Sequence, residues 1–105
     1  MEVKDLQKEM VKFVKRWDKV RNARPSKDAT FFHIVEEIGE LASQYVNRES
    51  RKEQYSEVEI KDAIGDALMQ LVKLADLYNF DIEELITEII QKEEVILREK
   101  EKQFQ

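Results

Sequence analysis

Only two glycines and one proline occur in the 105 residues of this chain. Strands joined by tight turns depend on these residues, so the sequence argues against a β-rich fold and favours an all-α one. Cysteine is absent, which excludes disulfides, thiolate zinc sites and cysteine nucleophiles. A length of 105 residues is about that of one ordinary domain. We therefore expect a single helical domain spanning residues 1–105.

Hydrophobic periodicity divides the chain into four helical segments. Apolar residues recur at three- and four-residue steps in each, which places them on one face of a helix. The polar stretch 47–54 is a connection or a frayed extension, and the charged end at about 99–105 is expected to fray. The predicted helices span about residues 3–20, 29–46 and 56–78, with the fourth following residue 81.

Turn and cap residues agree with this division. Pro25 marks the clearest loop, between the first and second segments. Asp28 and Asp81 are predicted N-caps, and Asn79 is a predicted helix stop. Four amphipathic helices leave more apolar surface than one small core covers. A four-helix bundle completed as a homodimer or homotetramer is therefore expected.

The charge balance limits the partners of the chain. Eighteen basic and 23 acidic side chains give a net charge of −5, which argues against a general nucleic-acid binder. The single histidine excludes a multi-histidine metal site within one subunit. No apolar run approaches the roughly 18 residues of a membrane span, and no apolar signal-peptide core is present. We expect no membrane association and a cytoplasmic location.

Two acidic stripes occupy the central pair of predicted helices. On the second helix His33, Glu37, Glu40 and Gln44 fall within about 60° of one another. On the third, Glu59, Asp62, Asp66 and Gln70 fall within about 80°. Clustered carboxylate oxygens are the ligands that Mg²⁺ requires. A solvated acidic face has the same pattern, so the spacing alone leaves both interpretations open.

Both glycines of the chain lie inside these two helices, each directly before an acid of the stripe. Gly39 precedes Glu40, and Gly65 precedes Asp66. Each glycine costs about 1 kcal/mol relative to alanine in a helix interior. Their matched positions indicate a close approach of two backbones or of a ligand.

The strings around the two glycines resemble the motifs of a known family. Phe-His-Ile-Val-Glu-Glu-Ile-Gly-Glu-Leu-Ala at 32–42 is similar to the first metal motif of the MazG-like nucleotide pyrophosphohydrolases, in the all-α nucleoside triphosphate pyrophosphohydrolase superfamily. Glu-Ile-Lys-Asp-Ala-Ile-Gly-Asp-Ala-Leu at 59–68 resembles the second. The resemblance covers about residues 13–98. The family usually has glutamate three residues before the second-motif aspartate, where this chain has Ala63.

This resemblance implies hydrolysis of a nucleoside triphosphate to the monophosphate and pyrophosphate, with Mg²⁺, or alternatively Mn²⁺, as cofactor. It implies metal ligands at Glu37, Glu40, Asp62 and Asp66, with Glu59 as a weak or outer ligand. Asp62 is predicted to take over part of the role of the family glutamate, which is missing because this chain has Ala63 at that position. Glu36, Glu37 and Glu40 are the predicted catalytic set, in which Glu36 is a candidate proton acceptor.

Binding of the polyphosphate also requires cationic side chains. Binding of the nucleotide base requires a flat apolar side chain on which it can stack. For most of these side chains an ordinary surface charge or core packing is an equally simple interpretation. The candidates for substrate binding are His33, Trp17, Arg24, Lys27, Lys73, Lys92 and Arg98.

Two other functions stay open at this stage. Ala63 is compatible with a degenerate member of the family that binds nucleotide but turns it over weakly. The stripes and glycines are also compatible with a non-catalytic helical oligomerisation module.

Overall fold

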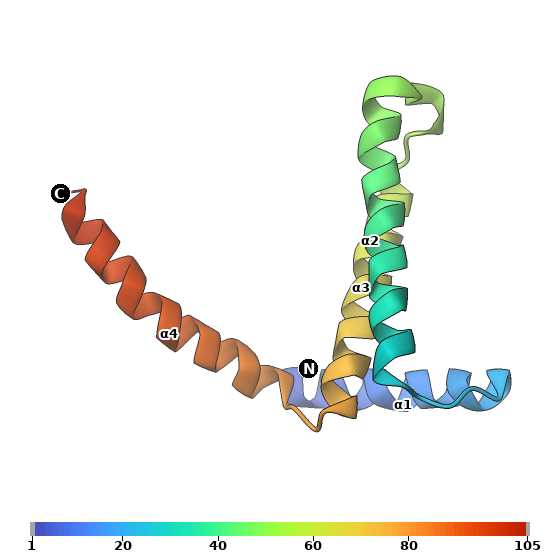
Figure 1. The fold of residues 1–105 in the computed structure, drawn as a ribbon, viewed down its shortest axis with the longest axis horizontal. Coiled ribbons are helices and arrows are strands. Elements are labelled where there is room, and N and C mark those ends of the chain that lie inside the picture. Colours follow the sequence, from blue (N-terminus) through green and yellow to red (C-terminus); the bar gives the residue numbers. More distant parts are fainter. Residues whose placement is uncertain (1, 105) are drawn as a thin grey trace.

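The computed structural model describes residues 2–104, and all regular structure in that range is helical (Figure 1). The predicted all-α fold is thereby confirmed. The elements are α1 (Val3–Arg21), α2 (Lys27–Ser50), the short 3₁₀ helix η1 (Lys52–Gln54), α3 (Glu57–Leu77) and α4 (Ile82–Gln103).

The caps explain where the helices begin. Asp81 caps α4 as predicted, because its carboxylate accepts from the backbone N–H of Glu83 at 2.9 Å and of Glu84 at 3.3 Å. The predicted cap of α2 at Asp28 is wrong. Ser26 holds that position and its hydroxyl accepts from the N–H of Ala29 at 3.0 Å. Asp28 instead lies in the first turn of α2, where its charge suits the helix dipole.

Two helices run further than the sequence indicated. α2 continues to Ser50, past the predicted end near residue 46, so part of the polar stretch is helical. Asn47 explains this extension, because its side-chain amide donates to the carbonyl of Gln54 and its oxygen accepts from Arg51. α4 is helical to Gln103, beyond residue 99 where fraying was expected; Gln105 lies outside the described residues.

α2 and α3 form an antiparallel hairpin, with η1 at its turn (Figure 1). α1 packs across α3 near the open end of this hairpin. α4 starts beside α1 and extends away from the hairpin (Figure 1). No helix in residues 2–104 combines the length and the apolar character that a bilayer crossing requires.

The core of the single chain is small. Its buried apolar residues are Val14, Ile34, Ala63, Ala67 and Ala75. The radius of gyration is 17.7 Å, whereas a compact domain of this length has about 13 Å. Most apolar side chains of the predicted stripes are therefore exposed.

The predicted close approach of backbones at the glycines does not occur within the chain. A Cβ added to Gly39 or Gly65 would meet no atom within 4 Å. Since α2 and α3 do not need these glycines in order to pack, the space beside them is free for a ligand or a second molecule.

Candidate functional site

The acidic stripes meet at Glu37 on α2. Its side chain is half-buried, and this burial raises its pKa above the ordinary value of 4.5. The nearby carboxylates of Glu40 and Asp66 raise the pKa further, and His33 opposes them. The hairpin therefore brings acids from both helices close enough to repel one another.

Glu37 also has an unmet requirement. Its Oε2 atom is buried and has no hydrogen-bond partner. A buried carboxylate oxygen surrounded by like charges is stabilised by a cation. As the side chains lie, no three acidic or histidine side chains in residues 2–104 are grouped tightly enough to hold a metal. The carboxylates of Glu37, Glu40 and Asp66 are of the ligand type that Mg²⁺ takes in proteins.

The remaining acids of the predicted site are exposed. Glu36 lies on the outer side of α2, and Glu59 and Asp62 are exposed on α3. None of the three contributes to the raised pKa of Glu37. Ala63 is only 4% exposed, in contrast to the acids beside it. Its methyl group is part of the small core.

A cavity of about 270 Å³ opens beside these acids, between α1 and the hairpin. Glu37 and Asp66 line one part of it. Apolar and charged side chains of α1, His33 of α2 and further side chains of α3 line the rest. The lining residues are Phe13, Val14, Trp17, Asp18, Arg21, His33, Glu37, Asp66, Met69, Gln70 and Lys73.

A second cavity of about 210 Å³ shares five of these residues, among them His33, Gln70 and Lys73. Arg24 lines this second cavity, towards the α1–α2 loop. A larger hollow of about 540 Å³ between α1 and the α3–α4 turn has no acid of the two stripes in its lining. The cavity of about 270 Å³ that Glu37 and Asp66 line is called the acidic cavity below and is the candidate site.

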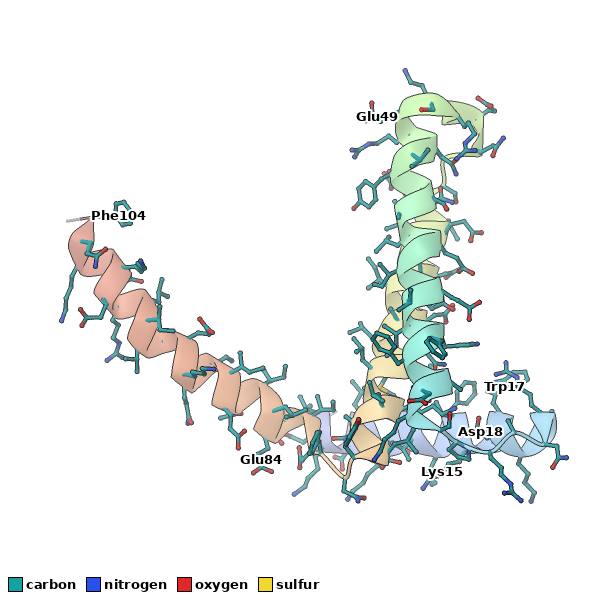
Figure 2. The ribbon with its side chains drawn as sticks, in the orientation of Figure 1. Lys15, Trp17, Asp18, Glu49, Glu84 and Phe104 are labelled. Carbon is teal, nitrogen blue, oxygen red and sulfur yellow. The ribbon has the colours of Figure 1, made fainter. Side chains whose placement is uncertain are left out.

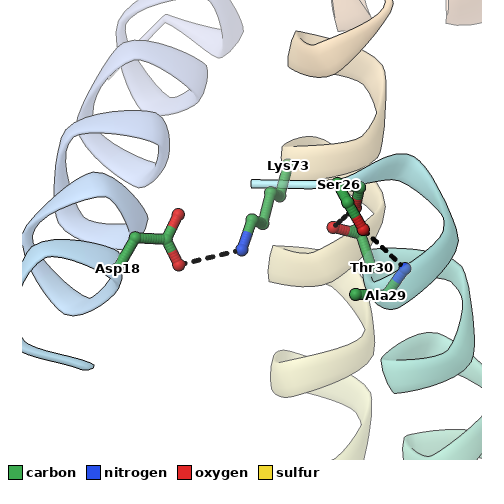
Figure 3. A network of polar contacts seen from close by, with 5 residues as sticks. All are labelled: Asp18, Ser26, Ala29, Thr30 and Lys73. Atoms are coloured by element: carbon green, nitrogen blue, oxygen red, sulfur yellow. Dashed lines mark hydrogen bonds and ion pairs between the residues drawn. The ribbon is translucent and has the colours of Figure 1, made fainter. Parts of the chain in front are cut away.

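An ion pair closes one side of the site. Lys73 on α3 donates from Nζ to Oδ1 of Asp18 on α1 at 3.0 Å, and both side chains are largely buried (Figure 3). Next to it, the Thr30 hydroxyl donates to the Ser26 carbonyl at 2.7 Å and fixes the first turn of α2 (Figure 3). The ion pair joins α1 to α3, and the first turn of α2 lies beside it (Figure 3).

The other predicted substrate residues are only partly brought together. Trp17, His33 and Lys73 line the acidic cavity. Lys27 does not, because its Nζ lies 4.1 Å from the ring centroid of Tyr78. Lys92 and Arg98 lie on the projecting α4, where Arg98 pairs with Glu94 at 2.9 Å. In the single chain these last two do not reach the acids.

Sequence reasoning missed Asp18. A signal was present, since Asp18 falls about 40° from Val14 on the helical wheel of α1, within its apolar arc. An acid on an apolar arc is either paired or functional. The structure shows that it is paired with Lys73 and lines both cavities.

These features define a class: an all-α protein whose central hairpin carries acids from both helices beside a cavity. Residues 26–101 match the family model described as MazG nucleotide pyrophosphohydrolase domain. The chain therefore belongs to the MazG family, which places it among hydrolases that act on phosphoric anhydrides.

A solved structure supports the same assignment. The crystal structure of the Bacillus-conserved MazG protein, a nucleotide pyrophosphohydrolase, matches with a TM-score of 0.66 and 27% identity. The match covers 88% of each chain. Curated proteins gave no match.

Proposed function

We propose that this chain is a cytoplasmic, Mg²⁺-dependent nucleoside triphosphate pyrophosphohydrolase, with Mn²⁺ as a possible substitute. Its substrate is a ribo- or deoxyribonucleoside triphosphate, and its products are the monophosphate and pyrophosphate. The observation that carries the proposal is the unpaired, buried Oε2 of Glu37, with Glu40 and Asp66 beside it and a cavity in front.

Each group of the site has a proposed part in the reaction. Glu37, Glu40, Asp62 and Asp66 would hold the metal, with Glu59 outside them. Mg²⁺ held by these acids would neutralise the phosphates and polarise the α-phosphoryl group. Water attacks the α-phosphorus, the α–β anhydride bond breaks, and the bond electrons leave with pyrophosphate. Glu36, which is exposed on α2, or a free oxygen of one of the ligand carboxylates would accept the proton of the water.

Cations and His33 position the substrate around this centre. His33 lines the cavity one turn before Glu37 and would hydrogen-bond the phosphates. Arg24 in the adjoining cavity adds positive charge. Lys27, now held over Tyr78, would need to leave that ring.

Pyrophosphate release from a panel of nucleoside triphosphates tests the proposed activity. We expect release with Mg²⁺ or Mn²⁺ and none after chelation with EDTA. The buried Ala63 favours one alternative, a family member that binds nucleotide with weak turnover. Nucleotide binding without metal-dependent release across the panel would support that alternative and contradict the proposal.

We also propose that the working form is a homodimer or homotetramer. The accessible surface is 8764 Å², whereas a compact monomer of this mass exposes roughly 6,200 Å². α4 has no buried residue, and its isoleucines Ile86, Ile89 and Ile90 are each more than half exposed. An excess of this size is covered in water by another copy.

Light scattering at micromolar concentration measures this directly. We expect a mass of at least twice the 12.6 kDa of the chain. Ile89→Glu together with Ile90→Glu should lower the mass towards one chain, since both substitutions place charges on the apolar face of α4. A mass of 12.6 kDa for the unaltered protein contradicts the prediction. In such an oligomer Lys92 and Arg98 would reach substrate only in another copy's site.

A further inference from the structure

Two hollows of opposite charge lie on either side of the turn between α3 and α4. Three exposed lysines of α1 line the larger hollow, of about 540 Å³. Two exposed glutamates at the start of α4 line the smaller hollow, of about 210 Å³. The hollows share the residues of the turn, so they form one continuous surface, called the turn surface below. Its basic half is Lys4, Lys8 and Lys12, its acidic half is Glu84 and Glu88, and Asn79, Phe80 and Asp81 join the halves.

The charges of the two halves are not neutralised by ion pairs within the chain. None of the ion pairs in residues 2–104 includes a lysine or a glutamate of the turn surface. The three lysines follow one another at steps of four residues on α1, and the two glutamates have the same spacing on α4 (Figure 2 labels Glu84). Like charges at this spacing repel each other. An opposite charge brought from outside relieves the repulsion in each row.

The distribution of charge along the chain agrees with this. α1 contains seven basic and three acidic side chains, a net charge of +4. Because the whole chain carries −5, the remaining residues carry −9. Asp76 and Asp81 also line the basic half, but the carboxylate of Asp81 is engaged as the N-cap of α4. The basic half therefore suits an acidic surface, and the acidic half suits a basic one.

A second copy of the chain supplies both surfaces at once. In a two-fold contact each copy presents the same patch, so the basic half of one copy meets the acidic half of the other, and the reverse. Phe80 is 49% exposed and lines both hollows, which provides apolar surface at the centre of the contact. A partner of a single charge sign, such as a nucleic acid, matches only one half.

We propose that the turn surface is a two-fold contact between two copies of this chain, in which the lysines of one copy pair with the glutamates of the other. The inference rests on the proposed homo-oligomer and not on the proposed activity. On the helix circle Glu84 and Glu88 each lie about 160° from Ile86. The isoleucine face of α4 therefore stays free for a separate contact, and two different contacts per copy produce a homotetramer.

The contact leaves the acidic cavity open. On the helix circle of α1, Lys8 lies about 140° from Phe13 and about 180° from Trp17, and these two aromatic residues line that cavity. Changes at the lysines should therefore alter the assembly and leave pyrophosphate release per chain unchanged.

Light scattering of charge-reversed variants tests the contact. Lys8→Glu combined with Lys12→Glu makes both halves acidic, and Glu84→Lys combined with Glu88→Lys makes both halves basic. Each change should raise the dissociation constant of the tetramer at least about tenfold, so the mass at micromolar concentration should fall from four chains to two. All four substitutions in one chain restore opposite charges across the contact and should restore the mass of four chains.

The matched control exchanges the same charges far from the contact. Lys52→Glu combined with Glu53→Lys lies on η1 at the other end of the hairpin and should keep the mass of four chains. Salt tests the contact without any variant, because the screening length falls from about 10 Å at 0.1 M to about 3 Å at 1 M. The unaltered protein should fall to two chains over the same range of NaCl.

The outcomes separate this contact from the proposals on which it does and does not rest. A mass of two or more chains that neither salt nor charge reversal lowers overturns the contact and leaves the homo-oligomer intact. A lowered mass in both reversed variants without recovery in the combined variant also overturns the contact. A mass of one chain at about 0.1 M NaCl overturns the contact and the homo-oligomer together. None of these results depends on pyrophosphate release.

Discussion

Replacing Glu37 with glutamine is expected to lower Mg²⁺-dependent pyrophosphate release at least about a hundredfold without destabilising the fold. Glutamine removes the charge at the centre of the acidic group, where Oε2 is buried without a partner. A neutral amide is a poor Mg²⁺ ligand. The same change removes repulsion from Glu40 and Asp66, the groups that raise the pKa of Glu37 together with burial. Metal-free stability is therefore expected to stay equal or rise.

Initial rates with Mg²⁺ and thermal unfolding in EDTA measure the two effects. Glu49→Gln is the matched control, since Glu49 lies on the same helix at the far end of the hairpin, away from Trp17 and Asp18 (Figure 2). That variant should keep both rate and stability. Wild-type turnover in Glu37→Gln, or a clear loss of its stability in EDTA, contradicts the role of Glu37.

The pH dependence of unfolding follows from the same shift. A folded-state pKa above the unfolded value of 4.5 means that the native state binds the proton more tightly. Between those two pKa values stability therefore falls as pH rises, and it recovers as pH falls through the folded pKa. Glu37→Gln should lose this contribution, so the wild-type and variant unfolding curves in EDTA should converge towards low pH.

The helices could be predicted because their signals are local. Periodicity and the scarcity of glycine and proline indicate four helices, and Asp81 is a cap in both sequence and structure. The cap at Asp28 was misplaced because Ser26, two residues earlier, is an equally good capping residue. The extension of α2 to Ser50 depends on the contact of Asn47 with Gln54. That contact forms only when the chain turns back, which periodicity does not report.

The site was less predictable because it depends on how three helices meet. The stripe acids were visible as a pattern, and the fold brings Glu37, Glu40 and Asp66 into electrostatic contact. The path of α1 across α3 was not encoded in any local pattern. Consequently the sequence did not predict that Asp18 pairs with Lys73. It also did not predict that the ammonium group of Lys27 lies over the ring of Tyr78.

The second large effect is expected at Asp62, which we propose replaces the family glutamate missing at position 63. Asp62→Ala is expected to reduce pyrophosphate release at least about a hundredfold, nearly as much as Glu40→Ala. Asp62 is exposed and lies 40° from Asp66 on the helix circle, about one residue's turn from Ala63. If Asp62 is a ligand, its oxygens would approach a cation from the flank opposite to that of the usual family glutamate. Glu57→Ala, in the first turn of α3, is the control and should keep the wild-type rate.

Ala63→Glu tests the same hypothesis by restoring the family glutamate at position 63. The sequence alone suggests unchanged or higher activity, but Ala63 is only 4% exposed. Without metal the added carboxylate is buried, so unfolding in EDTA should show a loss of about 2 kcal/mol or more. Mg²⁺ should restore that stability if the new carboxylate binds the ion, since ligand binding to the native state stabilises it.

Combining the two substitutions decides between replacement and degeneracy. If Asp62 replaces the missing family glutamate, the double variant Asp62→Ala with Ala63→Glu should regain most of the activity that Asp62→Ala loses. The glutamate introduced at position 63 then supplies the carboxylate oxygen that Asp62 no longer provides. Rates and Mg²⁺-dependent melting of the two single variants and the double variant provide the comparison. Wild-type turnover in Asp62→Ala shows that Asp62 is no ligand. A double variant that binds Mg²⁺ and folds, yet stays as inactive as Asp62→Ala, shows that the two positions are not interchangeable.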